Sequence, residues 1–281
     1  MSCTTAAYWR SGTSPGSPDV ADGAWKAGTL ELERLRSPEV GEALAQGFRT
    51  AVFACGAVEQ HGPHLPLFVD AEHGTRIAVE VARRLGRALV APTVRVGCSD
   101  HHLDFAGSLS IRPETLEAIC ADYCASLSHH GFEDICIVPT HGGNFAVLKE
   151  MLPRLRAAVA GSTRVHAYTD LLGFLVLWRA SVERTSPGMG TRVGGHADIA
   201  ETSLMLAMHS DLVRSDLAED GFHPVMDRAA FERIIAEGFS TVTPNGILGD
   251  ARGATIAIGE SAVTDLADHV AAFFRTALGE L

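Results

Sequence analysis

Three side chains able to hold a metal ion lie close together in residues 56–70. Glu59 and His61 are separated by one residue, and Asp70 follows them in the same stretch. The apolar run 50–55 directly precedes the stretch and has the length and β-branched content of a buried strand. Carboxylate oxygens and an imidazole nitrogen together suit Zn²⁺, Mn²⁺ or Fe²⁺. The pattern therefore predicts a candidate metal site just past the end of a strand.

Glutamate, histidine and aspartate are also common on solvated loops, so this stretch alone is ambiguous. Further candidates lie in 140–144, Thr-His-Gly-Gly-Asn, and in 194–203, Gly-Gly-His-Ala-Asp-Ile-Ala-Glu-Thr-Ser. Together with Glu-Gln-His-Gly-Pro-His at 59–64 and the downstream Asp70, these segments resemble the creatininase family of metal-dependent amidohydrolases. The resemblance extends over residues 30–275, and its motifs are specific in combination rather than singly.

The resemblance implies two divalent metal ions per chain, with Zn²⁺ as the first choice and Mn²⁺ or Fe²⁺ as alternatives. Asp70 would bridge both ions, Glu59 and His141 would hold one, and His61 would hold the other. His196 matches the family's catalytic histidine and would carry a proton to the leaving nitrogen. A hydroxide that bridges two such ions attacks a polarised carbonyl, so the expected target is an amide-type C–N bond.

One departure from the family concerns the second ion. Creatinine-hydrolysing members have a glutamate two residues after the strand histidine, where this chain has Gly143. Because glycine offers no ligand, another carboxylate must complete the site beside His61. Glu201 is the first candidate, since a helix that begins there can hold its carboxylate rigidly. Asp198 is the alternative, and in a third interpretation Glu201 only complements the positive end of the helix.

Other residues of these motifs are expected to orient the ligands or to line the substrate site. The loop 97–108 resembles the family's loop beside the active site, with Ala106 and Ser108 where relatives have proline and threonine. Its His101 and His102 either line the pocket or only cap the loop. The full supporting set is His64, Gln60, His102, Gly142, Gly143, Asn144 and Asp198.

Composition argues against several classes of protein. The 281 residues carry a formal charge of −11, so nucleic acid and anionic membrane surfaces would be repelled on average. No apolar run approaches the roughly 18 residues of a membrane span, and the N-terminal segment lacks the pattern of an export signal. The six cysteines include no Cys-x-x-Cys pair, which favours reduced thiols in a cytoplasmic protein.

The order of elements indicates an α/β fold. Residues 1–28 are expected to form a flexible or surface N-terminal arm, and residues 29–281 a single creatininase-like hydrolase domain. Strands alternating with helices favour a three-layer α/β/α sandwich with a mostly parallel central sheet. The strands are expected at 50–55, 88–94, 134–139 and 165–169, and the helices at 71–85, 113–129, 145–159, 201–212 and 262–278, with a short amphipathic helix within 30–44 before the first strand.

The leading hypothesis is a metal-dependent hydrolase of a cyclic amide, a formamide or a small peptide-like substrate. Glycine at positions 142 and 143 argues against creatinine itself. Two alternatives are hydrolysis of a cyclic carbonyl compound at the same site and a non-catalytic metal-binding or ligand-binding protein of the same fold. The presence of Asp70 and His196 favours catalysis. The expected partners are a small amide-like molecule and further copies of the chain, since the family commonly forms hexamers or other compact oligomers.

Overall fold

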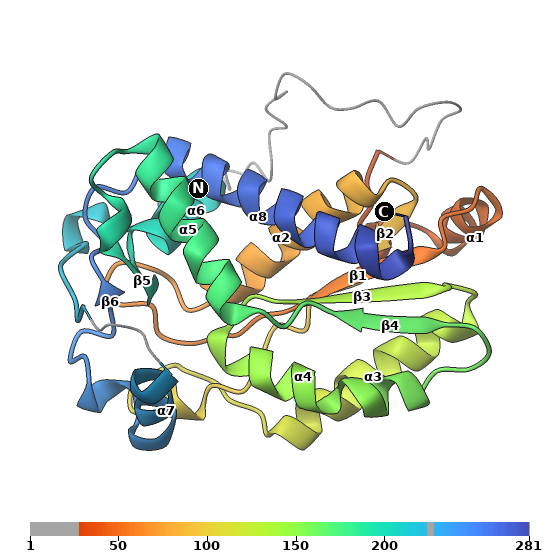
Figure 1. The fold of residues 1–281 in the computed structure, drawn as a ribbon, viewed down its shortest axis with the longest axis horizontal. Coiled ribbons are helices and arrows are strands. Elements are labelled where there is room, and N and C mark those ends of the chain that lie inside the picture. Colours follow the sequence, from red (N-terminus) through yellow and green to blue (C-terminus); the bar gives the residue numbers. More distant parts are fainter. Residues whose placement is uncertain (1–27, 224–227, 281) are drawn as a thin grey trace, which may run out of the picture.

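The computed structural model describes residues 28–223 and 228–280. The predicted N-terminal arm lies outside these residues, apart from Gly28. Four strands form the central sheet: β1 Thr50–Cys55, β2 Ala88–Val90, β3 Asp134–Pro139 and β4 Arg164–Ala167. All neighbours in this sheet are parallel, in the order β2-β1-β3-β4 (Figure 1).

β1 and β3 form the middle of the sheet. They pair along their whole length, from Thr50 opposite Asp134 to Cys55 opposite Pro139. Every residue of β3 is buried, as expected for a parallel sheet that is covered on both faces. Both strands have the bounds that the sequence predicts, whereas β2 and β4 are shorter than predicted.

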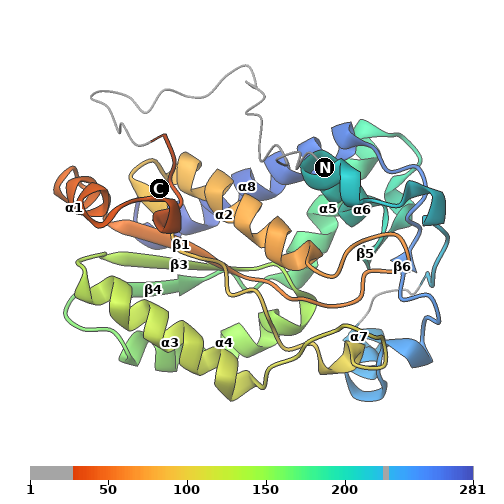
Figure 2. The same cartoon turned by 180° about the vertical axis from the view of Figure 1, so that it is seen from behind.

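Helices cover both faces of the sheet (Figures 1 and 2). Side chains of β1 divide between two cores, with Val52 and Ala54 in one and Ala51 and Phe53 in the other. The first core is closed by α2 Val69–Leu85, α5 Leu171–Thr185, α6 Ile199–His209 and α8 Ile256–Leu278, and the second by α1 Ser37–Ala45, α3 Pro113–His129 and α4 Gly142–Ala157. The predicted three-layer α/β/α sandwich is confirmed.

Two helix starts differ from the prediction in a way that matters for the site. α2 begins at Val69 rather than at residue 71, so Asp70 lies in the first helical turn and not in the preceding loop. α4 begins at Gly142 rather than at residue 145, so the predicted Gly-Gly-Asn turn is already helical. Both candidate ligand segments therefore pass directly into a helix, which restricts the backbone that carries them.

Two helices are absent from the sequence-based prediction. The apolar patch 174–178 is part of α5, whose first turn is capped because the Asp170 carboxylate accepts the Gly173 N–H. The other is α7 Arg228–Glu237, which is followed by a 3₁₀ turn at Phe239–Thr241. α7 packs against the 3₁₀ turn Asp100–His102, within the loop that the sequence places beside the site.

A second, smaller sheet carries His196. β5 Val193–His196 pairs antiparallel with β6 Leu248–Gly249. The pair lies beside α5 and α6, away from the four-stranded sheet (Figure 2). Gly194 and Gly195 of the Gly-Gly-His motif thus belong to a strand, and His196 is its last residue.

Two further sequence-based expectations concern membranes and thiols. Over the described residues, none of the helices combines the length and apolar character that a membrane span requires. The described cysteines are buried and free of disulfides: Cys55, Cys98, Cys120, Cys124 and Cys136.

Candidate metal centre

Five predicted ligands come together at the ends of different elements. Glu59 and His61 lie in the loop after β1, Asp70 in the first turn of α2, His141 directly after β3, and Glu201 in the first turn of α6. None of the five side chains is more than 3% exposed. Parallel strands deliver such residues to one edge of the sheet, which is where α/β proteins place their chemistry.

Glu59, Asp70 and His141 form one group with ligand atoms close enough to share an ion. His141 Nδ1 lies 3.2 Å from Glu59 Oε1 and 3.3 Å from Asp70 Oδ2. His141 Nε2–H donates to the backbone carbonyl of Cys98 at 3.0 Å, so Nδ1 is the nitrogen that faces the carboxylates.

His61, Asp70 and Glu201 form a second group that shares Asp70 with the first. His61 Nε2 lies 3.5 Å from Asp70 Oδ1 and 3.6 Å from Glu201 Oε2. The other ring nitrogen, Nδ1, donates to the backbone carbonyl of Glu59 at 3.1 Å. The two oxygens of Asp70 therefore face different histidines, one in each group.

The chemistry of these atoms fits divalent metal ions at both groups. Within the described part of the chain, neither carboxylate oxygen of Glu59 makes a hydrogen bond, nor does His61 Nε2 or Asp70 Oδ2, and their neighbours in the cluster face them only as ion pairs. A buried polar atom without a partner costs about 1–3 kcal/mol, and more when it is charged. A cation among these oxygen and nitrogen atoms would satisfy several of them at once. The cluster is thus able to hold metal.

Burial and neighbouring charges shift the pKa values in the cluster. Burial lowers the pKa of His61 and of His141, but the facing carboxylates outweigh it and raise both pKa values well above the usual 6.5. Burial raises the pKa of Asp70, but the two histidines outweigh it and hold that pKa far below its usual range. For Glu201, burial dominates over His61 and raises the pKa to about 7. Without metal, protons on the imidazoles balance the carboxylates.

The predicted catalytic residue, His196, lies against this cluster. Its Nε2–H donates to the backbone carbonyl of Gln60 at 2.8 Å, and its Nδ1 lies 3.9 Å from Glu59 Oε1. The ring is 4.3 Å from that of His61, centroid to centroid. Burial, with a further contribution from His61, lowers the pKa of His196 well below its usual value. The ring is therefore neutral, with Nδ1 directed at the cluster.

The turn between His196 and Glu201 is held by two carboxylates. Asp198 caps α6 and accepts four backbone N–H groups, two through each oxygen: those of Gly194, Gly195, Ala200 and Glu201. Ala197 has a left-handed backbone with φ 52°, and its N–H donates to Glu201 Oε2 at 2.5 Å. Asp198 is absent from the ligand groups, so the structure brings Glu201 and not Asp198 toward His61.

Two of the supporting histidines are fixed by polar partners around the cluster. His102 Nε2 lies 3.2 Å from Glu59 Oε1, while its Nδ1 accepts from the side-chain amide of Gln60 at 3.0 Å. His64 is buried, and its Nε2 lies 2.8 Å from Thr202 Oγ1 in α6. Burial lowers the pKa of His64 to about 4, so its ring is uncharged near neutral pH and fills space behind the site.

The Gly-Gly-Asn segment closes the site from the side of α4. The Asn144 amide donates to the carbonyls of Cys55 and Gly56 and accepts the Cys98 N–H, which ties β1 to the neighbouring loop. Gly142 lines the cavity described next. A Cβ atom at Gly143 would lie 2.3 Å from the Cys98 carbonyl oxygen and 2.6 Å from His141 Nε2. This loop arrangement therefore excludes a glutamate at position 143.

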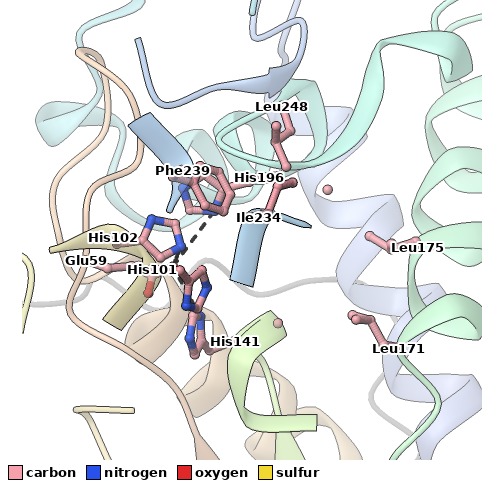
Figure 3. Close-up of a pocket in the computed structure, with 12 residues that line it drawn as sticks. Glu59, His101, His102, His141, Leu171, Leu175, His196, Ile234, Phe239 and Leu248 are labelled. Carbon is pink, nitrogen blue, oxygen red and sulfur yellow. Dashed lines mark ion pairs between the residues drawn. The ribbon is translucent and has the colours of Figure 1, made fainter. Parts of the chain in front are cut away.

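A cavity of about 450 Å³, its open mouth included, reaches the cluster (Figure 3). Its polar wall contains Glu59 and four histidines: His101, His102, His141 and His196. His101 and His102 thus lie on the wall of the pocket, as the first of the two sequence-based alternatives expects. The apolar wall of the cavity is formed by residues that stand in none of the motifs: Leu171, Leu175, Ile234, Phe239 and Leu248. The sequence gives one signal for this wall, because Leu171 and Leu175 have the spacing of two residues on one face of a helix. Phe239 belongs to no motif and gives no such signal.

Comparison with known proteins agrees with this geometry. The family described as creatinine amidohydrolase (creatininase) matches residues 33–274. A mycofactocin precursor peptide peptidase of Mycobacterium ulcerans is 30% identical over 76% of this chain and 79% of its own. A creatinine amidohydrolase of Pseudomonas putida is 28% identical, with 77% and 85% covered. A solved creatininase variant of the Zn-Zn type superposes with a TM-score of 0.70 at 25% identity, with 88% and 98% covered. The chain therefore belongs to the creatininase family of amidohydrolases.

Proposed function

We propose that this chain hydrolyses an amide-type C–N bond with the help of two divalent metal ions. Glu59, Asp70 and His141 would hold one ion, and His61 and Glu201 would hold the other together with the same Asp70. The observation that supports this assignment best is the set of buried ligand atoms without hydrogen-bond partners among the described residues. Asp70 faces one histidine of each group with each of its oxygens, so it would be able to serve both ions.

The chain's own residues supply positioning and proton transfer. Bound divalent ions supply Lewis-acid chemistry, which activates water near neutral pH and polarises the substrate carbonyl. His196 uses Nε2–H for the Gln60 carbonyl, so its Nδ1 is the atom that takes up a proton from the attacking water. The same nitrogen then returns that proton to the leaving nitrogen as the C–N bond breaks. His102 and Gln60 hold Glu59 and His196 in place during this transfer.

The ligands and the relatives favour particular kinds of metal ion and of substrate. Zn²⁺ is our first choice because imidazole and carboxylate ligands in a compact site suit it, with Mn²⁺ or Fe²⁺ as alternatives. Relatives carry the names of a peptide peptidase and of a creatinine amidohydrolase, which supports a cyclic amide, a formamide or a small peptide-like substrate. Gly143, which replaces the glutamate of creatinine-hydrolysing members, disfavours creatinine.

Two further proposals concern the cellular location of the protein and its assembly. We propose a cytoplasmic location, because the described cysteines are free thiols, which reducing compartments preserve. We also propose that copies of the chain assemble into a homo-oligomer, as the family commonly does.

Metal dependence is the direct test. The purified protein is assayed with formamides, cyclic amides and dipeptides before and after exhaustive chelation, and its metal content is measured by elemental analysis. We expect hydrolysis to disappear with the metal and to return with Zn²⁺, Mn²⁺ or Fe²⁺. Full activity in protein shown to be metal-free would overturn the proposal.

A further inference from the structure

The cavity has two unlike walls (Figure 3). Figure 3 shows the histidines gathered on one side, while Leu171 and Leu175 of α5 lie on the opposite side. Ile234, Phe239 and Leu248 complete the apolar wall and pack together as a cluster of their own. Among the described residues that line the cavity, none is a lysine or an arginine. The described lining thus offers no fixed side-chain cation for a charged substrate group.

The apolar wall extends up to the predicted catalytic histidine. Leu248 stands opposite His196 in the β5–β6 pair. The ring of Phe239 lies 4.8 Å from that of His196, centroid to centroid. Leu175 touches the residue before His196, since a Cβ atom on Gly195 would lie 2.9 Å from Leu175 Cδ2. An amide that reaches His196 therefore places its neighbouring substituent against these apolar side chains.

We infer that the substrate is an uncharged amide that carries an apolar substituent next to the scissile C–N bond. This inference rests on the proposed function. The apolar wall gains free energy from covering apolar substrate surface. A hydroxyl or carboxylate against Leu171 and Leu175 would lose its water without gaining a hydrogen-bond partner. The discrimination is therefore strongest against substituents that are charged.

A matched set of compounds tests this substrate class. The metal-loaded protein is given N-formylphenethylamine, N-formylethanolamine and N-formylphenylalanine, which are apolar, hydroxylated and carboxylated. A lactam and a blocked dipeptide are tested with the same three kinds of substituent. We expect kcat/KM for the apolar compound of the hydrolysed scaffold to be at least about tenfold higher than for the other two. Equal or better turnover of the carboxylated compound overturns the inference.

Binding separates this inference from the proposed function. Calorimetric titration of the metal-loaded protein with the same compounds measures preference whether or not turnover follows. Tighter binding of the apolar compound without hydrolysis of any scaffold supports the apolar preference of the cavity and contradicts the proposed function. Hydrolysis without an apolar preference supports the proposed function and contradicts the inference.

Variants in α5 test whether the apolar wall causes the preference for apolar substituents. Leu175→Arg adds a cation to the apolar wall, and Val176→Arg adds it to the neighbouring residue, which is 66% exposed. We expect the first variant to shift the ratio of apolar to carboxylated binding by about tenfold toward the carboxylate, and the second to leave it unchanged. Leu175→Asn, with a smaller uncharged side chain, should reduce the apolar preference as well. Unchanged ratios in both folded Leu175 variants overturn the inference.

Discussion

Asp70 is the residue on which the two ligand groups meet. Its backbone is held as firmly as its side chain: Thr140 donates its hydroxyl to the Asp70 carbonyl at 2.8 Å. A Cβ atom on Gly56 would lie 2.6 Å from the same carbonyl oxygen, so glycine is needed for β1 to approach α2 this closely. The position of the carboxylate thus depends on the residues that directly follow β1 and β3.

Replacement of Asp70 should affect both ions. We expect Asp70→Ala to lower the occupancy of both metal positions, since in the proposed site one carboxylate would serve two ions, whereas Glu59→Ala should empty mainly one. Elemental analysis of the folded variants measures ions per chain, and circular dichroism verifies folding. Two ions retained in Asp70→Ala would show that the carboxylate does not bridge.

Metal uptake should depend on pH through His61 and His141. Burial lowers their pKa values, but the facing carboxylates raise them well above 6.5, so both rings hold protons near neutral pH in the metal-free protein. A ligand nitrogen must first lose its proton, so metal affinity should fall as the pH drops from about 8 to about 6. Calorimetry in buffers of different ionisation enthalpy should detect protons released on binding. Binding without proton release would contradict this.

At this scale the sequence predicts which side chains come together, because most of the proposed ligands stand in short motifs. Glu59 and His61 are two residues apart, and His141 directly follows a recognisable strand. The exact partner of His61 is not predictable, because Asp198 and Glu201 lie in one turn and only the hydrogen bonds of Asp198 to four backbone N–H groups separate them. Phe239 is also unpredictable, since its contact with His196 depends on tertiary packing.

Among the elements, the turn from β5 to α6 has the largest effect on the site. It presents His196 from its strand end and Glu201 from its first helical turn. The left-handed backbone of Ala197 costs about 1–3 kcal/mol for a residue with a side chain. The Asp198 cap and the bond from Ala197 N–H to Glu201 hold the turn in this conformation.

The Asp198→Asn substitution tests this turn. An amide places its NH₂ against two backbone N–H donors, so we expect a loss of about 1–2 kcal/mol in the free energy of unfolding. We also expect kcat to fall at least about tenfold as His196 moves. Asp216→Asn is the matched control, because Asp216 is 62% exposed and pairs with Arg214 on the surface. Denaturant unfolding and kinetics of both variants give the comparison, and identical stabilities would contradict the role of Asp198.

Local signals explain which elements are predictable. β1, β3 and α3 have the predicted bounds because apolar runs, Pro113 at the start of α3 and Gly131 just after its end mark them in the sequence. α2 and α4 begin earlier than predicted because their first turns consist of site residues and glycines rather than of a standard cap. α7 is recognised only in the fold, where it packs against the turn Asp100–His102.

At the scale of the whole molecule, the site brings together segments that are far apart in the sequence. Its proposed ligands lie in α2 and α6 and in the segments that follow β1 and β3, and they span residues 59 to 201. Metal ions held by these ligands would stabilise only the folded chain. We expect chelation to lower the melting temperature reversibly, and differential scanning fluorimetry with Zn²⁺ added back measures it. A melting temperature that does not respond to metal would argue against ligands from all four elements.

Assembly is a second property of the whole molecule. The proposed homo-oligomer should be present at micromolar concentration in light scattering, with a mass that is a multiple of 29.8 kDa. A monomer over this range would refute it.

The close packing around Gly143 also restricts how this chain could change by mutation. A single exchange to glutamate would force a side chain into the Cys98 carbonyl, 2.3 Å from the new Cβ, before any metal contact could form. The loop around Cys98 must therefore change in the same lineage. Glutamate at position 143 is therefore expected to be deleterious until the loop has changed, which is epistasis between two segments 45 positions apart. The order of the two changes then matters: a path from glycine to glutamate at this position has to begin in the loop around Cys98.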